Sequence, residues 1–223
     1  MVSRITTDDN KVLDTINFLR AVNEVDSAQF HVLMNISRKR ELEYGDILVH
    51  QGSASRELFF LVDGHMGAYV RDEELNKHIQ IGLVRPGEMI GELSLALDVQ
   101  DRQATVRVIS ESATILGFRQ ETFTNRDRYP ELEDRVYFIF WRDLTQSLKW
   151  RVDMFEMKYP DSPRIADLAS KAREIRRTVP SVHDFAFDPL GSLEIISRQA
   201  GEIARVLTEC NQLVAFHRAM EIE

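Results

Sequence analysis

The residues best suited to chemistry lie in one stretch of the chain, residues 86–106. Gly87 permits a turn there, and Gly91-Glu92-Leu93-Ser94 is expected to begin a short helix from Glu92 to about Leu97. The start of a helix presents backbone N–H groups without acceptors and the positive end of the dipole, which together favour an anion. Arg102 follows after a polar loop. Because a guanidinium binds phosphate through two parallel hydrogen bonds, the stretch predicts a phosphate site.

Glu92 adds a second kind of recognition to this stretch. An ionised carboxylate only accepts hydrogen bonds, so it cannot bind phosphate but can accept from the hydroxyl groups of a ribose. An anion site, an arginine and a carboxylate for the sugar together predict a pocket for a nucleotide.

The same stretch resembles the phosphate-binding cassette of cyclic-nucleotide-binding domains, above all those of the bacterial cAMP receptor type. Gly91-Glu92-Leu93 and the run Arg102-Gln103-Ala104-Thr105-Val106 stand at the spacing of that family. The segments 43–47, 51–52 and 58–64 resemble its first strands and turns. The resemblance covers residues 10–158, which is about two thirds of the chain.

The resemblance implies cAMP or cGMP as the ligand, with no metal and no catalytic residue. Arg102 would pair with the cyclic phosphate and Glu92 with the ribose 2′-hydroxyl, while backbone amides assist. In this family a polar residue of a long helix touches the base, which implies Ser147 here, with Thr145 as the second choice. The full set of implied ligand-binding residues is Gly91, Glu92, Leu93, Ser94, Arg102, Gln103, Ala104, Ser147 and Thr145.

Gln103 departs from the family, which usually has Ser, Ala or Thr at this place. Its backbone amide remains available, whereas its longer side chain must point elsewhere or meet the ligand. The choice between cAMP and cGMP therefore stays open. The alternative is a domain that kept the fold and lost the ligand, with Arg102 on the surface and Glu92 stabilising a helix start.

Short strands are expected to position this stretch. Eight of the ten glycines lie between Gly45 and Gly117, among short apolar runs, which is typical of strands joined by tight turns. The predicted fold is α+β, with a β-barrel of the jelly-roll type (double-stranded β-helix). The expected strands are Asp46–His50, Glu57–Val62, Met66–Val70, His78–Val84, Thr105–Ile109 and Ala113–Phe118.

Helical spacing of apolar residues marks both flanks of the predicted barrel. Ser27 is the expected N-cap of the second N-terminal helix. Pro130 is expected to open a long helix that runs to about Met157, and Pro160 and Pro163 to stop it. The remaining predictions are helices at Lys11–Val22, Ser27–Ile36, Arg164–Thr178 and Leu193–Met220, and a loop at Val179–Ser192.

These elements predict three parts: a cyclic-nucleotide-binding domain with N-terminal helices at 1–128, a long helix at 129–158 and a helical tail at 159–223. The long helix is dense in aromatic residues around 137–141. A continuous apolar face of this length is rarely left exposed by a monomer. We therefore expect a two-fold homodimer through this helix, as in the family.

The tail does not read as the helix-turn-helix domain that follows the long helix in the cAMP receptor branch. It carries eight Lys and Arg against ten Asp and Glu, whereas a DNA reader normally has the opposite balance. Its apolar stripe favours a protein partner over DNA, either the same tail of the other subunit or a separate protein. Two alternatives remain open: a transcription regulator with a divergent DNA-binding tail, and a ligand-free dimeric scaffold.

Composition excludes several other classes. The chain has 223 residues, a net charge of -8 and one cysteine, Cys210, which excludes an internal disulfide and a cysteine-rich metal site. No apolar run approaches the roughly 20 residues that span a bilayer, and the first ten residues lack a secretory signal. No nucleophile–base pair or metal-ligand motif is present in the sequence. We expect a cytoplasmic bacterial regulator rather than an enzyme.

Overall fold

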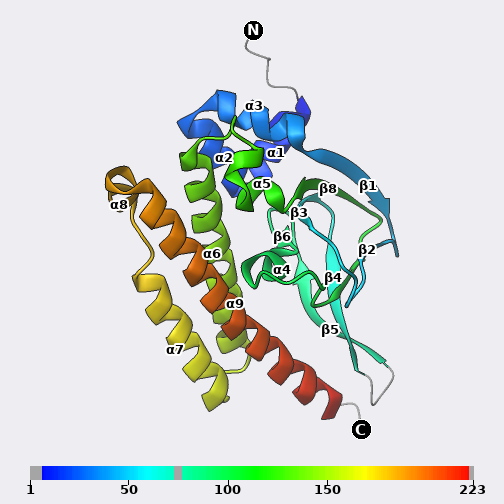
Figure 1. Ribbon diagram of the computed structural model, residues 1–223. Coiled ribbons are helices and arrows are strands. Elements are labelled where there is room, and N and C mark those ends of the chain that lie inside the picture. Colours follow the sequence, from blue (N-terminus) through cyan, green and yellow to red (C-terminus); the bar gives the residue numbers. More distant parts are fainter. Residues whose placement is uncertain (1–6, 73–76, 221–223) are drawn as a thin grey trace.

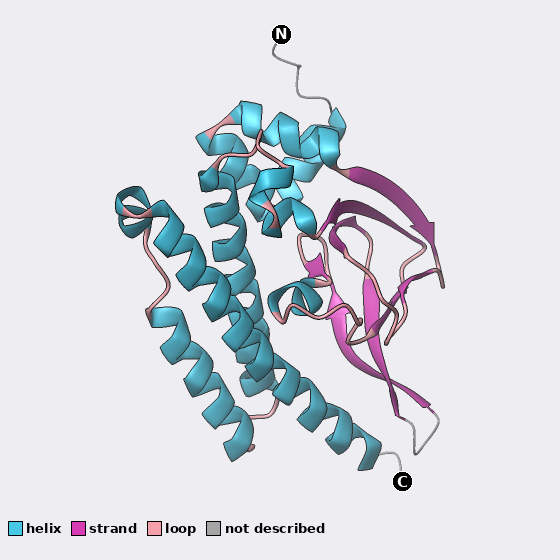
Figure 2. Ribbon diagram, in the orientation of Figure 1, coloured by secondary structure: helices cyan, strands magenta, loops and turns pink. Residues whose placement is uncertain are grey.

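The computed structural model describes residues 7–72 and 77–220. A β-sandwich lies beside a set of long helices, and three short N-terminal helices cover one end of both (Figure 1, Figure 2). No helix in the described ranges combines the length and apolar character that a membrane crossing requires.

The sandwich consists of two four-stranded antiparallel sheets with the orders β1-β8-β3-β6 and β2-β7-β4-β5. Their facing sides enclose one apolar cluster that includes Leu61, Met66, Val108 and Ile115. The expected jelly-roll fold is confirmed, as two open sheets rather than a closed cylinder. The strands are β1 Arg38–Glu43, β2 Ile47–Val49, β3 Glu57–Asp63, β4 Met66–Asp72, β5 Lys77–Val84, β6 Met89–Ile90, β7 Thr105–Val108 and β8 Ser112–Arg119.

All six expected strands are present, and β1 and β6 are two that the sequence did not predict. β1 has the sequence RKRELE and lies at the edge of its sheet, where charged side chains are exposed to solvent. β6 has only two residues, both buried, and pairs with β3 just before Gly91.

The N-terminal helices differ from the expectation in two details. The single helix expected at Lys11–Val22 is divided into α1 Thr7–Thr15 and α2 Asn17–Val25, because Ile16 has an extended backbone. The third helix is α3 Ser27–Ile36. Its N-cap is not Ser27, as expected, but Asp26, whose side chain accepts a hydrogen bond of 2.8 Å from the amide of Ala28.

The helical tail differs from the expectation at residues 179–192, where two helices begin. The predicted loop Val179–Ser192 is wrong: Ser181 and Asp184 form a capping box that starts a short helix, and Pro189 occupies the first position of the next helix. The remaining helices are α4 Glu92–Ala96, α5 Glu121–Thr124, the 3₁₀ turn η1 Arg126–Arg128, α6 Asp134–Lys158, α7 Pro163–Arg177, α8 Val182–Phe187 and α9 Pro189–Met220.

α9 runs alongside α6, and α7 packs against both (Figure 1). Ile196, Ile203 and Leu207 of α9 are fully buried in the same cluster as Leu144 and Leu148 of α6. The apolar face of α6 is therefore covered by the tail of the same chain. The argument for a homodimer assumed that this face would be exposed, so that argument no longer holds.

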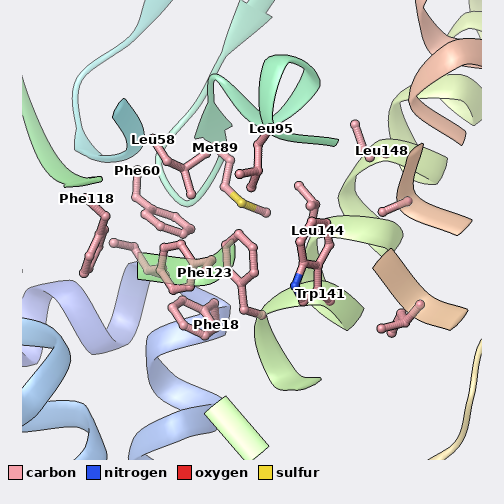
Figure 3. Close-up of a cluster of buried hydrophobic side chains, with 14 of the residues drawn as sticks. Phe18, Leu58, Phe60, Met89, Leu95, Phe118, Phe123, Trp141, Leu144 and Leu148 are labelled. Atoms are coloured by element: carbon pink, nitrogen blue, oxygen red, sulfur yellow. The ribbon is translucent and has the colours of Figure 1, made fainter. Parts of the chain in front are cut away.

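Aromatic residues fix α6 to the sandwich and to the N-terminal helices. The rings of Phe123 and Phe140 stack with their centroids 3.8 Å apart, and Phe18 packs edge-on to both. Figure 3 shows Met89 and Leu95 facing the same cluster, from β6 and α4. This core therefore holds α6 in a fixed position relative to the segment that contains Gly91 and Glu92.

Candidate functional site

A cavity of about 360 Å³ lies between one sheet of the sandwich, α4, α6 and α9. Its apolar wall comes from the sheet β2-β7-β4-β5, and includes Val49, Val70 and Val106. Most of the polar groups lie in the segment 91–104, which we call the cassette, and on the two long helices, and Gln51 and Arg71 add two more from the sheet side.

Gly91 is the N-cap of α4 and has a φ of 94°, a conformation that L side chains rarely adopt. A Cβ atom at this position would collide with the guanidinium of Arg102 and lie 2.9 Å from the carbonyl oxygen of Glu57. Glycine is therefore required here for two reasons, the turn and the close approach of Arg102 to the backbone.

Arg102 is buried, with 3% of its surface exposed, and lines the cavity. Its Nη2 donates to Ser55 Oγ at 2.8 Å and to the carbonyl oxygen of Glu57. Its Nε and Nη1 are buried without an acceptor among the described residues. Burial lowers the pKa of Arg102, and nearby Glu57 opposes this shift. Because buried donors without acceptors are costly, the arrangement favours an anion beside this guanidinium.

Glu92 is also buried, with 4% of its surface exposed, and it accepts a hydrogen bond from Nη1 of Arg151 on α6. Arg151 lines the cavity and was missed by the sequence reasoning. The available signal was its place three residues after Leu148 and seven after Leu144, on the buried face of the helix. An arginine at such a place needs an acidic partner.

The other cassette residues line the same cavity: Leu93, Ser94, Gln103 and Ala104. Ser94 Oγ donates to the carbonyl oxygen of Asp101 at 3.1 Å, and Gln103 Nε2 donates to the same oxygen at 3.0 Å. The long side chain of Gln103 therefore folds back onto its own loop. All seven residues expected in the cassette are brought together around one cavity.

The two residues expected to touch the base are placed elsewhere. Thr145 is fully buried and donates to the carbonyl oxygen of Trp141 within α6. Neither Thr145 nor Ser147 is among the described residues that line the cavity. Polar residues of α9 line it instead, namely Thr208, Asn211 and Gln212, which we call the roof.

The geometry of the cassette agrees with a comparison of sequences. Residues 39–126 match the family model of the cyclic nucleotide-binding domain. The matched residues include the whole cassette. The segments α6 to α9 lie outside the matched residues, and no comparison shows a DNA-binding domain in them.

Two curated relatives extend this comparison. The chain is 22% identical over 194 residues to the Pycsar effector protein BcPycTIR of Burkholderia cepacia, which covers 82% of this chain and 59% of the relative. It is 37% identical over 60 residues to the cAMP-activated global transcriptional regulator CRP of Salmonella typhimurium, which covers 27% of this chain and 28% of the relative. The chain thus spans less than two thirds of either protein.

Two solved structures superpose on part of this chain. The regulatory domain of Toxoplasma gondii PKA with cAMP superposes with a TM-score of 0.49 at 18% identity, covering 68% of this chain and 54% of that one. The N-terminal domain of a transcriptional regulator from Streptomyces coelicolor superposes with a TM-score of 0.45 at 24% identity, covering 55% and 83%.

Proposed function

We propose that the chain is a cytoplasmic, non-enzymatic regulator that binds a cyclic nucleoside monophosphate, with cAMP as the first candidate. The observation that carries the proposal is the buried guanidinium of Arg102, two of whose nitrogens have no acceptor among the described residues, in a cavity that a nucleotide-binding cassette lines. A cyclic phosphate would supply the missing acceptors and the opposite charge.

The proposed roles follow from the positions of the groups. Arg102 binds the phosphate, and the amides of Leu93, Ser94 and Gln103 assist it. Glu92 accepts from the ribose 2′-hydroxyl while Arg151 holds its carboxylate in place. The charges that line the cavity support an anionic ligand, because among the described lining residues Arg102 and Arg151 outnumber the acidic Glu92, in a chain of net charge -8.

The proposed signal passes through the helices that border the cavity. Arg151 ties α6 to Glu92, and α9 lies against both α4 and α6. A ligand that contacts these helices shifts their arrangement by its difference in affinity between the two states. Val182 and Phe187 on α8 and Leu190 at the start of α9 are exposed apolar residues, and they offer a surface to a protein partner.

We keep the homodimer through α6 as a hypothesis, on the part of this helix that the tail leaves exposed. Trp150, Met154 and Met157 follow one another at helical spacing and are 45%, 37% and 73% exposed. Light scattering with and without nucleotide tests it, and the expected result is a mass of twice 25.8 kDa. A monomeric mass at high micromolar concentration would contradict it.

Calorimetry with cAMP and cGMP tests the proposed function. Folded protein is expected to bind one nucleotide per chain, and Arg102→Ala is expected to lose the binding. Arg107→Ala is the matched control, because Arg107 is exposed on β7 and lies outside the residues that line the cavity. No heat at high micromolar concentration from a folded sample would refute the proposal.

The same samples test the two alternatives. A DNA-binding tail predicts that the protein is retained by DNA at low salt and released as salt increases. A ligand-free scaffold predicts a folded dimer that binds neither cAMP nor cGMP.

A further inference from the structure

We infer that α9 reads the base of the bound nucleotide, and that Asn211 is the residue that selects it. The inference rests on the proposed function, and it assigns base selection to the tail rather than to α6. Adenine is the first candidate, because a carboxamide presents a donor beside an acceptor and so can pair with the N6–H₂ and N7 edge of that base.

The first step of the argument is the division of the cavity. The cassette supplies the buried charges that suit the phosphate and the sugar, namely Arg102 and Glu92. The wall formed by β2, β4, β5 and β7 is largely apolar, with Arg71 as its charged residue, and its inner strands β4 and β7 are hydrogen-bonded to their neighbours. α9 crosses from α6 towards β4 and β5 and closes the remaining side (Figure 1).

The second step is the choice among the three polar residues of the roof. The hydroxyl of Thr208 donates to the carbonyl oxygen of Ala204 at 2.9 Å, so its proton is already used within the helix. The side-chain amides of Asn211 and Gln212 have no hydrogen bond to any described residue. Asn211 is half-buried and Gln212 is exposed. Asn211 is therefore the amide that is both free to pair and shielded from water.

The third step is the contact that holds the roof on the cassette. Gly201 of α9 lies against α4, and a Cβ atom at this position would stand 2.9 Å from the carbonyl oxygen of Ala96. The absence of a side chain lets α9 approach the helix that begins at Glu92. A change at Gly201 should therefore displace the whole roof, whereas a change at Asn211 should remove only one polar contact.

Calorimetry with cAMP, cGMP, cCMP and cUMP separates these effects. Asn211→Leu keeps the approximate volume and removes the amide, and is expected to reduce the preference for cAMP over the weakest of the other three nucleotides by about 5- to 100-fold. Asn211→Ala serves as a second variant with the same expected loss of preference. Gly201→Ala is expected to lower the affinity for all four nucleotides by a common factor and to leave their ranking unchanged.

Arg205→Ala is the matched control on α9, because Arg205 is exposed and lies outside the residues that line the cavity. Its ranking of the four nucleotides is expected to equal that of the wild type. The inference is overturned if Asn211→Leu and Asn211→Ala keep the wild-type ranking, if the wild type binds all four bases equally, or if Gln212→Ala changes the ranking instead. Absence of binding by the folded wild type would overturn the proposed function as well, so the two failures are distinguishable.

Discussion

The cassette and the roof face the same cavity but hold their polar groups in different ways. In the cassette, Glu92, Ser94 and Arg102 are between 2% and 4% exposed, and each has a hydrogen-bond partner within the chain. In the roof, Asn211 is half-buried and Gln212 is exposed, and neither side-chain amide is hydrogen-bonded to a described residue.

This difference has a physical consequence. A buried charge is tolerated only with a partner of fixed geometry, so few residue types suit a place such as that of Arg102. An exposed amide on a helix costs little in the absence of ligand, so many residue types suit the roof. We therefore expect the cassette to decide whether a nucleotide binds and the roof to decide which one.

The largest expected effect is the loss of nucleotide affinity in Arg102→Ala. Removing one member of a buried charge pair costs about 2–5 kcal/mol, which is about 30-fold or more in the dissociation constant. Calorimetry of the folded variant measures it. Arg102→Lys keeps the charge and loses the fork of donors, so its affinity should lie between those of Arg102→Ala and the wild type.

Thermal unfolding without nucleotide separates a ligand-binding arginine from a structural one. Two nitrogens of Arg102 are buried without acceptors, which costs free energy and offsets what its other hydrogen bonds contribute. Arg102→Met should therefore change the free energy of unfolding by only about 1 kcal/mol. A loss of stability of several kcal/mol with unchanged nucleotide affinity would show that Arg102 serves the fold and not the ligand.

Gly91→Ala is expected to damage stability and binding together. The positive φ and the contacts with Arg102 and Glu57 leave no room for a methyl group, so a loss of about 2 kcal/mol in the free energy of unfolding is expected. Chemical denaturation measures it. Gly45→Ala is the control, because Gly45 also has a positive φ but its Cβ would meet no atom within 4 Å. Equal losses in the two variants would contradict a close approach of Arg102 to Gly91.

Glu92 is expected to contribute less, through the sugar. The wild type should bind 2′-deoxy-cAMP about 10-fold more weakly than cAMP, because the carboxylate then lacks its hydroxyl partner. Glu92→Gln should reduce this difference. A wild type that binds both nucleotides equally would show that the partner of Glu92 is Arg151 alone.

The smallest expected effect on nucleotide binding lies on α6, where a partly buried carboxyl changes stability alone. Burial raises the pKa of Asp143 to about 6, so between pH 4 and pH 6 the folded chain binds more protons than the unfolded chain. This residue therefore makes the free energy of unfolding fall as the pH rises through that window and level off above it. Asp143→Asn should be more stable by up to about 3 kcal/mol at pH 7, with unchanged nucleotide affinity. Denaturation at pH 4 and pH 7 measures the difference, and equal pH profiles would contradict it.

The cassette could be predicted from sequence because its groups are close together in the chain. A turn at Gly91, a helix start at Glu92 and a strand after Arg102 fix their mutual position through local structure alone. The strands with apolar residues were predicted for a similar reason. β1 was not, because its charged residues lie at a sheet edge and carry no apolar alternation.

The roof could not be predicted in this way. The stripe of α9 that includes Ile203 and Leu207 shows that one face is buried, but it does not show against which partner. Only the packing of α9 on α6 and α4 places Asn211 at the cavity, and the same packing covers the face that suggested a dimer. Ser147, with Thr145 as the second choice, was expected at the base because a family pattern was applied to a helix that packs beneath the tail of this chain.

A crystal structure of the chain grown with cAMP tests the central claim most directly. The account predicts the cyclic phosphate within hydrogen-bond distance of Nε and Nη1 of Arg102, with the ribose beside Glu92 and the base beneath Asn211. A cavity that excludes the nucleotide, or a phosphate bound away from Arg102, would contradict it.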